Sequence, residues 1–179
     1  MSTDAITLLK NDHRTVEKLF DQFEKTDSKR EKAGIVAKAI MELKVHATIE
    51  EEIFYPVVRK ALNKKLGKEE ATDMMDEADE EHHVAKVLIA ELGAMKASDD
   101  HWGGKFTVLS EAILHHVKEE EGEMFVEARK TDIDFKALGE QMLMRKEELV
   151  KTGVPTFAEE TLIAEGGIAD SPMEAAATR

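Results

Sequence analysis

The sequence predicts an all-α protein, an up-down-up-down four-helix bundle with a short fifth helix and a C-terminal tail. Three observations lead to this fold class. The chain is rich in Ala, Leu, Glu, Lys and Met, which are strong helix formers, and its 179 residues include only three prolines and ten glycines. Apolar residues recur with helical periodicity in four long segments. The third and fourth segments also repeat polar patterns of the first and second.

The first two predicted helices are joined by the turn "KTDSKRE". Ser2 or Thr3 is the expected N-cap of the first helix, whose apolar stripe also contains a histidine. Ser28 opens the second helix as the N-cap of a capping box, and Gly67 ends it. Pro56 lies inside this second helix, where we expect a kink or a local break because proline removes a backbone donor.

The third helix is predicted over about residues 69–97, and "KASDDHWGG" forms the turn before the fourth. A shorter amphipathic helix follows over about residues 134–151, and Gly153 and Pro155 stop it. The remaining residues are small and polar, which is typical of a mobile or loosely docked tail. The chain is thus divided into a four-helix bundle, an additional helix and a tail, over residues 1–130, 131–152 and 153–179.

The acidic composition excludes several classes of partner. A formal net charge of -13 with no long basic run argues against binding to nucleic acid or to an anionic membrane. No apolar run approaches the roughly 20 residues needed to span a bilayer, and the start "MSTDAITLLKNDHR" does not resemble a signal peptide, so we expect a cytoplasmic protein. The chain has no cysteine, so any metal site must use histidines and carboxylates.

An internal repeat selects the polar residues that face the core. "DHRTVEKLFDQF" aligns with "EHHVAKVLIAEL", and "HATIEEEIFY" aligns with "HVKEEEGEMF". Within these alignments the inward residue is His82 rather than His83, and His116 rather than His115. The pairs that the repeat matches are His13 with His82, His46 with His116, Glu50 with Glu120, and Tyr55 with Phe125.

The spacing of these residues predicts that six of them meet in one layer. His13 and His46 are equidistant from the first predicted turn, and His82 and His116 are equidistant from the second predicted turn. In an antiparallel helix pair, such residues lie at the same level along the bundle. A glutamate four residues after a histidine shares its helix face, which adds Glu50 and Glu120 to the layer.

A buried layer of four imidazoles and two carboxylates requires positive charge. Without a cation it would carry a large desolvation penalty, so the layer predicts two divalent or trivalent metal ions bridged by the carboxylates. Nitrogen and oxygen donors without sulfur suit iron, manganese or zinc, and ligand type alone does not choose among them. Glu51 and Glu121 could reach positions behind the ligands. Tyr55 stands roughly opposite His46 by helical angle, so packing is its default role, although a distortion at Pro56 could turn its phenol inward.

The order His, HxxxE, His, HxxxE resembles the hemerythrin HHE cation-binding family. The matching motifs are "NDHR", "HATIEEEIFYP", "EEHHVAKVLIAEL" and "HHVKEEEGEMF", within about residues 4–130. The resemblance implies a non-haem di-iron pair, oxo- or hydroxo-bridged, that binds O2 or a related ligand such as peroxide or nitric oxide. The resemblance also implies that the terminal ligands of the metal ions are His13, His46, His82 and His116. It implies that the bridging ligands are Glu50 and Glu120.

The chain departs from the oxygen-carrying members of that family. A further histidine that they place on the third helix corresponds to Lys86, and their last ligand is an Asp where this chain has Glu120. Fewer protein ligands leave more positions open to water, to small ligands or to Tyr55. The leading hypothesis is a binding protein for oxygen or iron sensing, storage or stress protection. The alternatives are a di-iron enzyme with catalase-like or nitric-oxide-consuming activity, and an interaction module with incidental metal.

Overall fold

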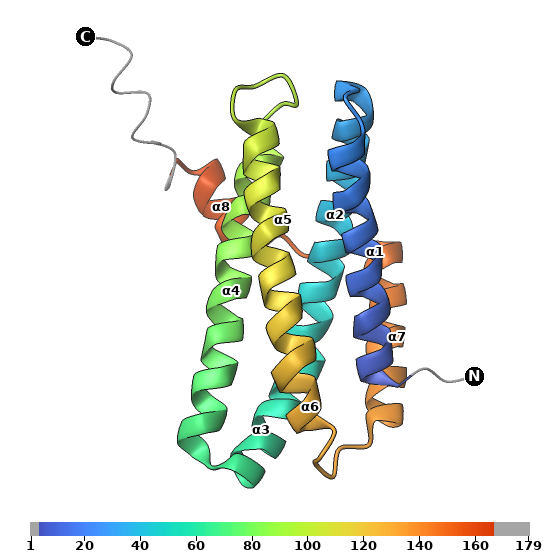
Figure 1. Ribbon diagram of the computed structural model, residues 1–179, viewed down its shortest axis with the longest axis vertical. Helices are drawn as coiled ribbons and strands as arrows, with labels where there is room; N and C mark the ends of the chain where they lie inside the picture. The colour runs from blue at the N-terminus through green and yellow to red at the C-terminus, as the bar shows by residue number, and fades with distance from the viewer. Residues whose placement is uncertain (1–3, 167–179) are drawn as a thin grey trace.

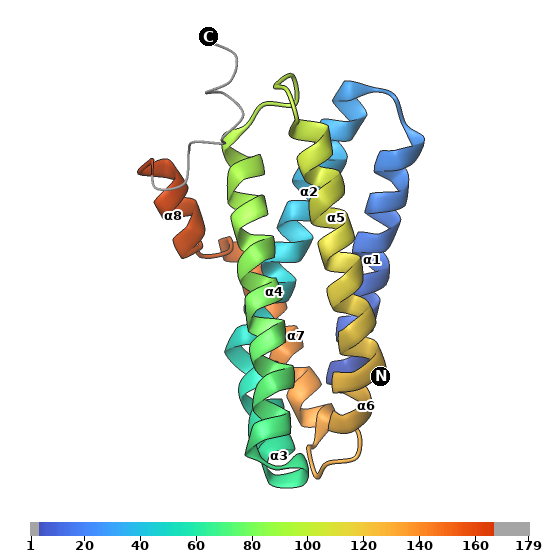
Figure 2. The same cartoon turned by 60° about the vertical axis from the view of Figure 1, so that its left-hand side comes forward.

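The computed structural model describes residues 4–166 and confirms the predicted all-α four-helix bundle (Figures 1 and 2). Four long helical segments run antiparallel to their neighbours in the chain, and two of the segments contain an internal change of helix type. In chain order, the segments are α1 (Ala5–Lys25); α2 (Lys29–Ile49) with η1 (Glu50–Phe54) and α3 (Tyr55–Leu66); α4 (Lys68–Ala94); and α5 (Trp102–Glu119) with η2 (Glu120–Met124) and α6 (Phe125–Ala128).

Local signals explain where the first helices begin and end. Asp4 is the N-cap of α1, and its carboxylate accepts a hydrogen bond from the Thr7 backbone N–H, whereas the predicted caps at residues 2–3 lie outside the described residues. Ser28 caps α2 as predicted. The Glu31 carboxylate binds the Thr26 hydroxyl, so the reciprocal half of the capping box is not formed. Gly67 ends α3 with a φ of 95°, a conformation that favours glycine.

Two π-helical turns, η1 and η2, interrupt the second and fourth segments. The Tyr55 N–H donates to the Glu50 carbonyl, and the Phe125 N–H donates to the Glu120 carbonyl, so each turn spans five residues. The break predicted at Pro56 therefore takes the form of η1, which ends two residues before this proline. Only η1 is followed by a proline, so a proline is not required for a turn of this kind.

Two apolar clusters fill the bundle above and below one polar layer. The upper cluster lies near the α1–α2 and α4–α5 connections and includes Phe20, Phe106 and Leu109. The lower cluster includes Leu9 and Phe54. Because each cluster draws side chains from all four segments, the level of the intervening polar layer is fixed from both sides.

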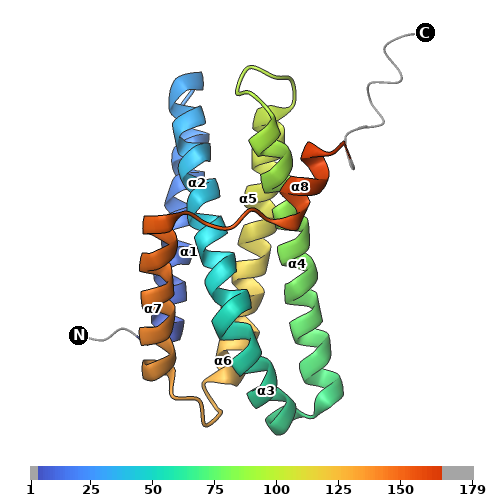
Figure 3. The ribbon, with the colours of Figure 1, turned by 180° about the vertical axis from the view of Figure 1, so that it is seen from behind.

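Two further helices pack outside the bundle (Figure 3). The predicted fifth helix is α7 (Phe135–Thr152), which begins after the N-cap Asp134 and contacts α1 and α2. The sequence analysis missed α8 (Ala158–Ala164), which packs against α4 inside the segment assigned to the tail. The rest of that tail, residues 167–179, lies outside the described residues. Within residues 4–166, no helix is both long and apolar enough to cross a membrane.

Candidate metal centre

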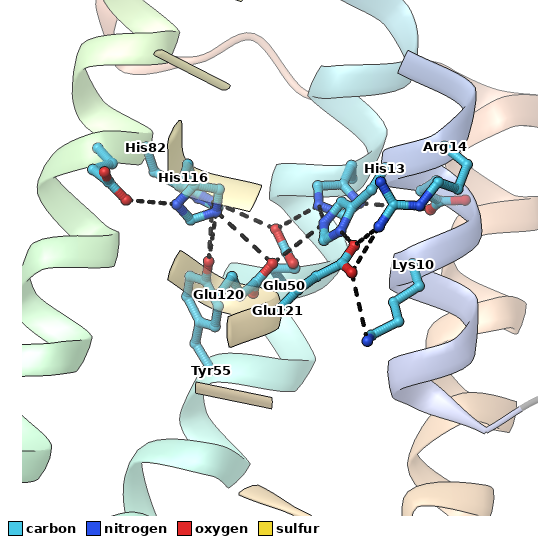
Figure 4. A network of polar contacts seen from close by, with 12 residues as sticks. Lys10, His13, Arg14, Glu50, Tyr55, His82, His116, Glu120 and Glu121 are labelled. Atoms are coloured by element: carbon cyan, nitrogen blue, oxygen red, sulfur yellow. Dashed lines mark hydrogen bonds and ion pairs between the residues drawn. The ribbon is translucent and has the colours of Figure 1, made fainter. Parts of the chain in front are cut away.

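The structure brings all six residues of the predicted layer together at mid-height of the bundle (Figure 4). Each of the four helical segments contributes one histidine, and the two glutamates begin the π-helical turns. All six side chains are buried, and Glu50 and Glu120 are only 0% and 2% exposed. A layer of this polarity inside an apolar core needs internal charge compensation.

The histidines form two pairs whose Nε2 atoms point at each other. The Nε2 atoms of His13 and His46 are 3.2 Å apart, and those of His82 and His116 are 3.3 Å apart. Two imidazoles bound to one ion at about 2.0–2.1 Å in tetrahedral geometry have nitrogens about 3.3 Å apart. Each pair therefore has the separation of two ligands on a common ion.

A carboxylate lies behind every one of these histidines. Such a partner holds the proton on Nδ1 and leaves the lone pair of Nε2 available for a metal. Three of the contacts are hydrogen bonds and the fourth is a longer ion pair. The distances from Nδ1 are 2.8 Å for His13 to Glu121, 2.8 Å for His82 to Glu51, 2.7 Å for His116 to Glu81, and 3.6 Å for His46 to Asp12.

The sequence analysis identified half of these outer carboxylates. Glu51 and Glu121 occupy the predicted positions behind the ligands, whereas Asp12 and Glu81 were missed. The repeat contained a signal for the missed pair, because Asp12 and Glu81 each directly precede the inward histidine of an aligned segment. Burial opposes ionisation of Glu51, but hydrogen bonds from His82 and Lys86 outweigh it and lower the pKa of this carboxyl.

Glu50 and Glu120 lie between the two histidine pairs. Oε2 of Glu50 is 3.0 Å from Nε2 of His46 and 3.4 Å from Nε2 of His82. Oε2 of Glu120 is 3.3 Å from Nε2 of His13 and 3.9 Å from that of His116. No oxygen of either carboxylate has a hydrogen-bond partner among the described residues. Buried carboxylates that lack hydrogen bonds and lie within reach of both histidine pairs fit two bridged metal ions.

Without metal, protons supply the missing positive charge. Burial disfavours the charged form of His46, yet Glu50 and Asp12 outweigh it and raise its pKa to about 10. Burial of His82 is likewise outweighed by Glu50 and Glu51, which raise its pKa to about 9. Burial raises the pKa of Glu120, and the charge of Glu50 raises it further. The centre thus favours cations at its core.

Tyr55 packs in the lower apolar cluster and also points its hydroxyl into the centre, which is the alternative that the sequence analysis left open for a distorted helix. Its hydroxyl lies 3.1 Å from Nε2 of His82 and 3.4 Å from Nε2 of His116. The i to i+5 bond of η1 places Tyr55 about one turn after Glu50, so both side chains face the centre. In an uninterrupted α-helix, the side chain of Tyr55 would face away from it. Phe125 occupies the matching position in the repeat and stacks on the His13 ring at a centroid distance of 6.0 Å. The two halves of the centre therefore differ.

A small cavity of about 30 Å³ adjoins the upper side of the histidine layer. Leu43, Ile89 and Val117 line it together with the ligand histidines. Lys86 also lines this cavity and donates to Glu51 at 2.6 Å. The space exceeds the roughly 10–15 Å³ that one water-sized molecule requires.

The three remaining histidines of the chain are outside the layer. His83, His101 and His115 are all exposed. His83 pairs with Glu159 of the helix α8 at 2.9 Å. His115 lies 3.6 Å from Glu81 and 3.2 Å from Glu119. None of the three shares a contact with the two bridging glutamates among the described residues.

Four histidines and two buried carboxylates, contributed by four helical segments and able to hold metal, are typical of a metal-binding helical-bundle protein. The model of the Hemerythrin HHE cation binding domain matches residues 4–128, and the chain belongs to this family. A crystal structure of a hemerythrin HHE cation binding domain-containing protein from Mycobacterium kansasii is similar in fold, with a TM-score of 0.67 and 23% identity. The match covers 88% of this chain and 97% of that one.

A curated relative shares the sequence pattern over a limited region. A protein named DNA nickase from Nostoc sp. (strain PCC 7120 / SAG 25.82 / UTEX 2576) is 25% identical over 122 residues, which is 68% of this chain. The matched region spans about a third, 32%, of the length of that relative. The similarity is thus confined to one part of a longer protein.

Proposed function

We propose that the centre holds two iron ions and binds O2 or a related small ligand, such as peroxide or nitric oxide, for oxygen or iron sensing, storage or stress protection. The observation that carries the proposal is the pair of converging Nε2 atoms on either side of two buried carboxylates that have no hydrogen-bond partner among the described residues. Iron suits donors that are all nitrogen and oxygen, and when bound it supplies redox chemistry and open coordination positions. His13, His46, His82 and His116 would be terminal ligands, and Glu50 and Glu120 would bridge.

The cavity above the centre supports a small, neutral ligand. Its volume of about 30 Å³ suits a molecule of two heavy atoms, and its walls are mostly aliphatic. Such walls exclude bulk water and favour an apolar gas over a charged metabolite. The four histidines of the centre line this space, so a ligand in it would lie beside the ions.

A second candidate is an enzyme that turns over peroxide or consumes nitric oxide, and Tyr55 favours it. Its hydroxyl reaches into one half of the centre only, next to His82 and His116. Burial raises the pKa of Tyr55, and the charges of Glu120 and Glu50 raise it further, so the phenol keeps its proton. A protonated hydroxyl held there can donate a hydrogen bond, or a proton, to a ligand oxygen.

Metal analysis combined with absorption spectra tests the proposed function. We expect about two irons per chain, and absorption bands that differ between anaerobic and oxygenated samples. Replacement of Glu120 by alanine should lower the iron content by about half or more, because it removes a carboxylate that reaches both histidine pairs. Bound zinc with a featureless spectrum would contradict the proposal.

Peroxide turnover by the iron-loaded chain separates the two candidates. If the chain is an enzyme, hydrogen peroxide is consumed catalytically, and the Glu120→Ala variant loses this activity. Glu111→Ala is the matched control, since Glu111 is exposed on the same helical segment. A stable oxygen adduct without turnover supports the binding protein and rejects the enzyme.

A further inference from the structure

An acidic groove leads from the surface to the lower side of the centre. It measures about 330 Å³ and lies between α4 and the segment formed by α5 and η2, which run side by side (Figures 1 and 2). On α4, Glu70, Asp73, Glu77 and Glu81 follow one another at helical spacing along a single face. These four positions climb roughly 16 Å from the end of the bundle to the level of the metal layer.

The groove carries negative charge that is largely uncompensated. Seven carboxylates line it, and its described lining includes no lysine or arginine; the carboxylates are Glu70, Asp73, Glu77, Glu81, Glu119, Glu120 and Glu123. No ion pair joins Glu70, Asp73, Glu77 or Glu123 to a described side chain. Elsewhere on α4, by contrast, the exposed carboxylates Asp76 and Asp79 pair with Arg59.

The groove ends on two residues of the proposed metal centre. Glu120 and His116 form part of its wall, although Glu120 is only 2% exposed. Both oxygens of this glutamate lack a hydrogen-bond partner among the described residues. An unpartnered buried carboxylate at the inner end distinguishes the groove from an ordinary acidic surface, whose groups are satisfied by water.

We propose that this groove is the route by which divalent cations enter the centre, an inference that rests on the proposed metal-binding function. Clefts lined by charge of one sign raise the local concentration of the opposite ion and its rate of association. Successive carboxylates along α4 offer a cation transient oxygen partners as it loses its water shell. The last step transfers it to Glu120 and His116, which belong to both the groove and the centre.

The two openings of the centre therefore have different chemistry. The cavity on the upper side is small and mostly aliphatic, which would reject a hydrated cation. The groove on the lower side is larger and acidic, which would repel an anion and offers little to an apolar gas. Metal and small ligand would thus approach the same layer from opposite sides.

The rate of cobalt uptake by the metal-free chain tests this route. The variant Glu70→Gln/Asp73→Asn/Glu77→Gln removes three groove charges at exposed positions that contact no proposed ligand. Stopped-flow absorption of bound Co²⁺ at low salt should show uptake slowed by roughly tenfold, the lower end of typical electrostatic steering. The final cobalt content should equal that of the unmodified chain. Glu77→Lys, a single reversal of charge, should also slow uptake.

A charge-matched variant separates the groove from the net charge of the chain. Glu24→Gln/Asp27→Asn/Glu111→Gln makes the same three changes of residue type at exposed positions outside the groove. We expect its uptake rate to stay within about twofold of the unmodified chain. Added salt should slow the unmodified chain toward the groove variant, because the screening length falls from about 30 Å at 0.01 M to about 3 Å at 1 M.

Three results of the cobalt uptake experiments would contradict the entry route, and one of them would also contradict the metal centre. Full cobalt binding with equal rates in all proteins would overturn the route and leave the metal centre intact. Equal slowing of the groove variant and the matched variant would also overturn it, since net charge alone would then explain the rates. Absence of cobalt binding by the unmodified chain would reject the metal centre and the route together.

Discussion

Tyr55 and Phe125 break the symmetry of a centre that is otherwise built from matched residues. Histidines, bridging glutamates and outer carboxylates all occur in pairs related by the repeat, from Asp12 with Glu81 to Glu50 with Glu120. At this one position a hydroxyl faces the histidines in one half, and a plain aromatic ring stacks on a histidine in the other. Two ions in the centre would consequently have different neighbours.

Replacement of Tyr55 by phenylalanine should isolate the role of this hydroxyl. The variant should fold, because the ring is retained and Phe125 already occupies the equivalent site. Loss of the hydrogen bond to His82 should lower the free energy of unfolding of the metal-free chain by about 1 kcal/mol. Urea denaturation measures this change.

The near-ultraviolet spectrum provides a second measurement on the same variant. Tyr55 is the single tyrosine of the chain, so a tyrosine difference signal on metal addition reports this residue alone. We expect the signal in the unmodified chain and its absence in Tyr55→Phe. The same difference spectrum in both proteins would show that the phenol does not sense the ions.

The sequence predicted the six inward residues correctly because their relative positions depend only on regular α-helix. His46 and Glu50 are four residues apart, and the helix is regular α-helix up to Glu50, where the π-helical turn begins, so the phase calculation applies to them. Tyr55 follows that turn, where one additional residue shifts the phase. Pattern analysis assumes a constant period, so it gave packing as the default for this residue and could turn the phenol inward only by invoking a distortion at Pro56. A preference for π-helix has no simple signature in composition.

At the scale of elements, α8 and the residue before it contact lysines that lie close to the metal centre. The Phe157 ring lies 5.0 Å from Nζ of Lys44 on α2 and 5.0 Å from Nζ of Lys86 on α4. Lys86 in turn binds Glu51, which holds the outer nitrogen of His82. Glu160 pairs with Lys44 and also accepts the Phe157 N–H. The segment that includes α8 thus contacts Lys86, and Lys86 is linked through Glu51 to the proposed ligand His82.

Alanine at Phe157 should loosen α8 without unfolding the bundle. Two cation–π contacts at a half-buried site contribute roughly 0.5–1 kcal/mol each, so local opening should become easier by about 1–2 kcal/mol. Limited proteolysis should then cut faster within residues 153–157, while the metal content stays unchanged. Leu162→Ala, on the exposed face of the same helix, should change the cutting rate little. Equal protection of both variants would show that Phe157 does not hold α8.

The docking of α8 could not be predicted from the local sequence. A segment of seven residues is too short to form a stable helix alone, so its structure depends on tertiary contacts. Those contacts join Glu159 to His83 and Glu160 to Lys44, residues 76 and 116 positions away in the chain. Nothing in the composition of the segment identifies such partners. The fifth helix, by contrast, carries its own cap and stop signals, Asp134 and Gly153.

At the scale of the whole molecule, stability and metal binding are coupled through one buried layer. Two apolar clusters hold six polar side chains at a fixed level, and a chain of net charge -13 offers little positive charge to neutralise them. The metal-free chain must therefore bind protons at this layer, whereas metal ions would replace them. The two states should respond to pH in opposite directions.

In the metal-free chain, stability should fall as the pH rises. The folded pKa values of His46 and His82 are raised from 6.5 to about 10 and about 9. Their contribution is fully present below about pH 6.5 and is lost as the pH rises through those folded values. Urea denaturation between pH 6.5 and 9.5 measures the decline, and His83→Gln is a surface control that should not change it.

In the metal-loaded chain, the sign should reverse at low pH. Ligation requires neutral imidazoles, so the unfolded chain binds more protons than the folded one below its ordinary histidine pKa of about 6.5. Stability should then fall as the pH is lowered from about 7 to 5 and stay nearly constant from 7 to 9. Urea denaturation between about pH 5 and 9.5, with and without saturating Co²⁺, compares the two states. Parallel pH profiles would show that the histidines of the layer do not exchange protons for metal.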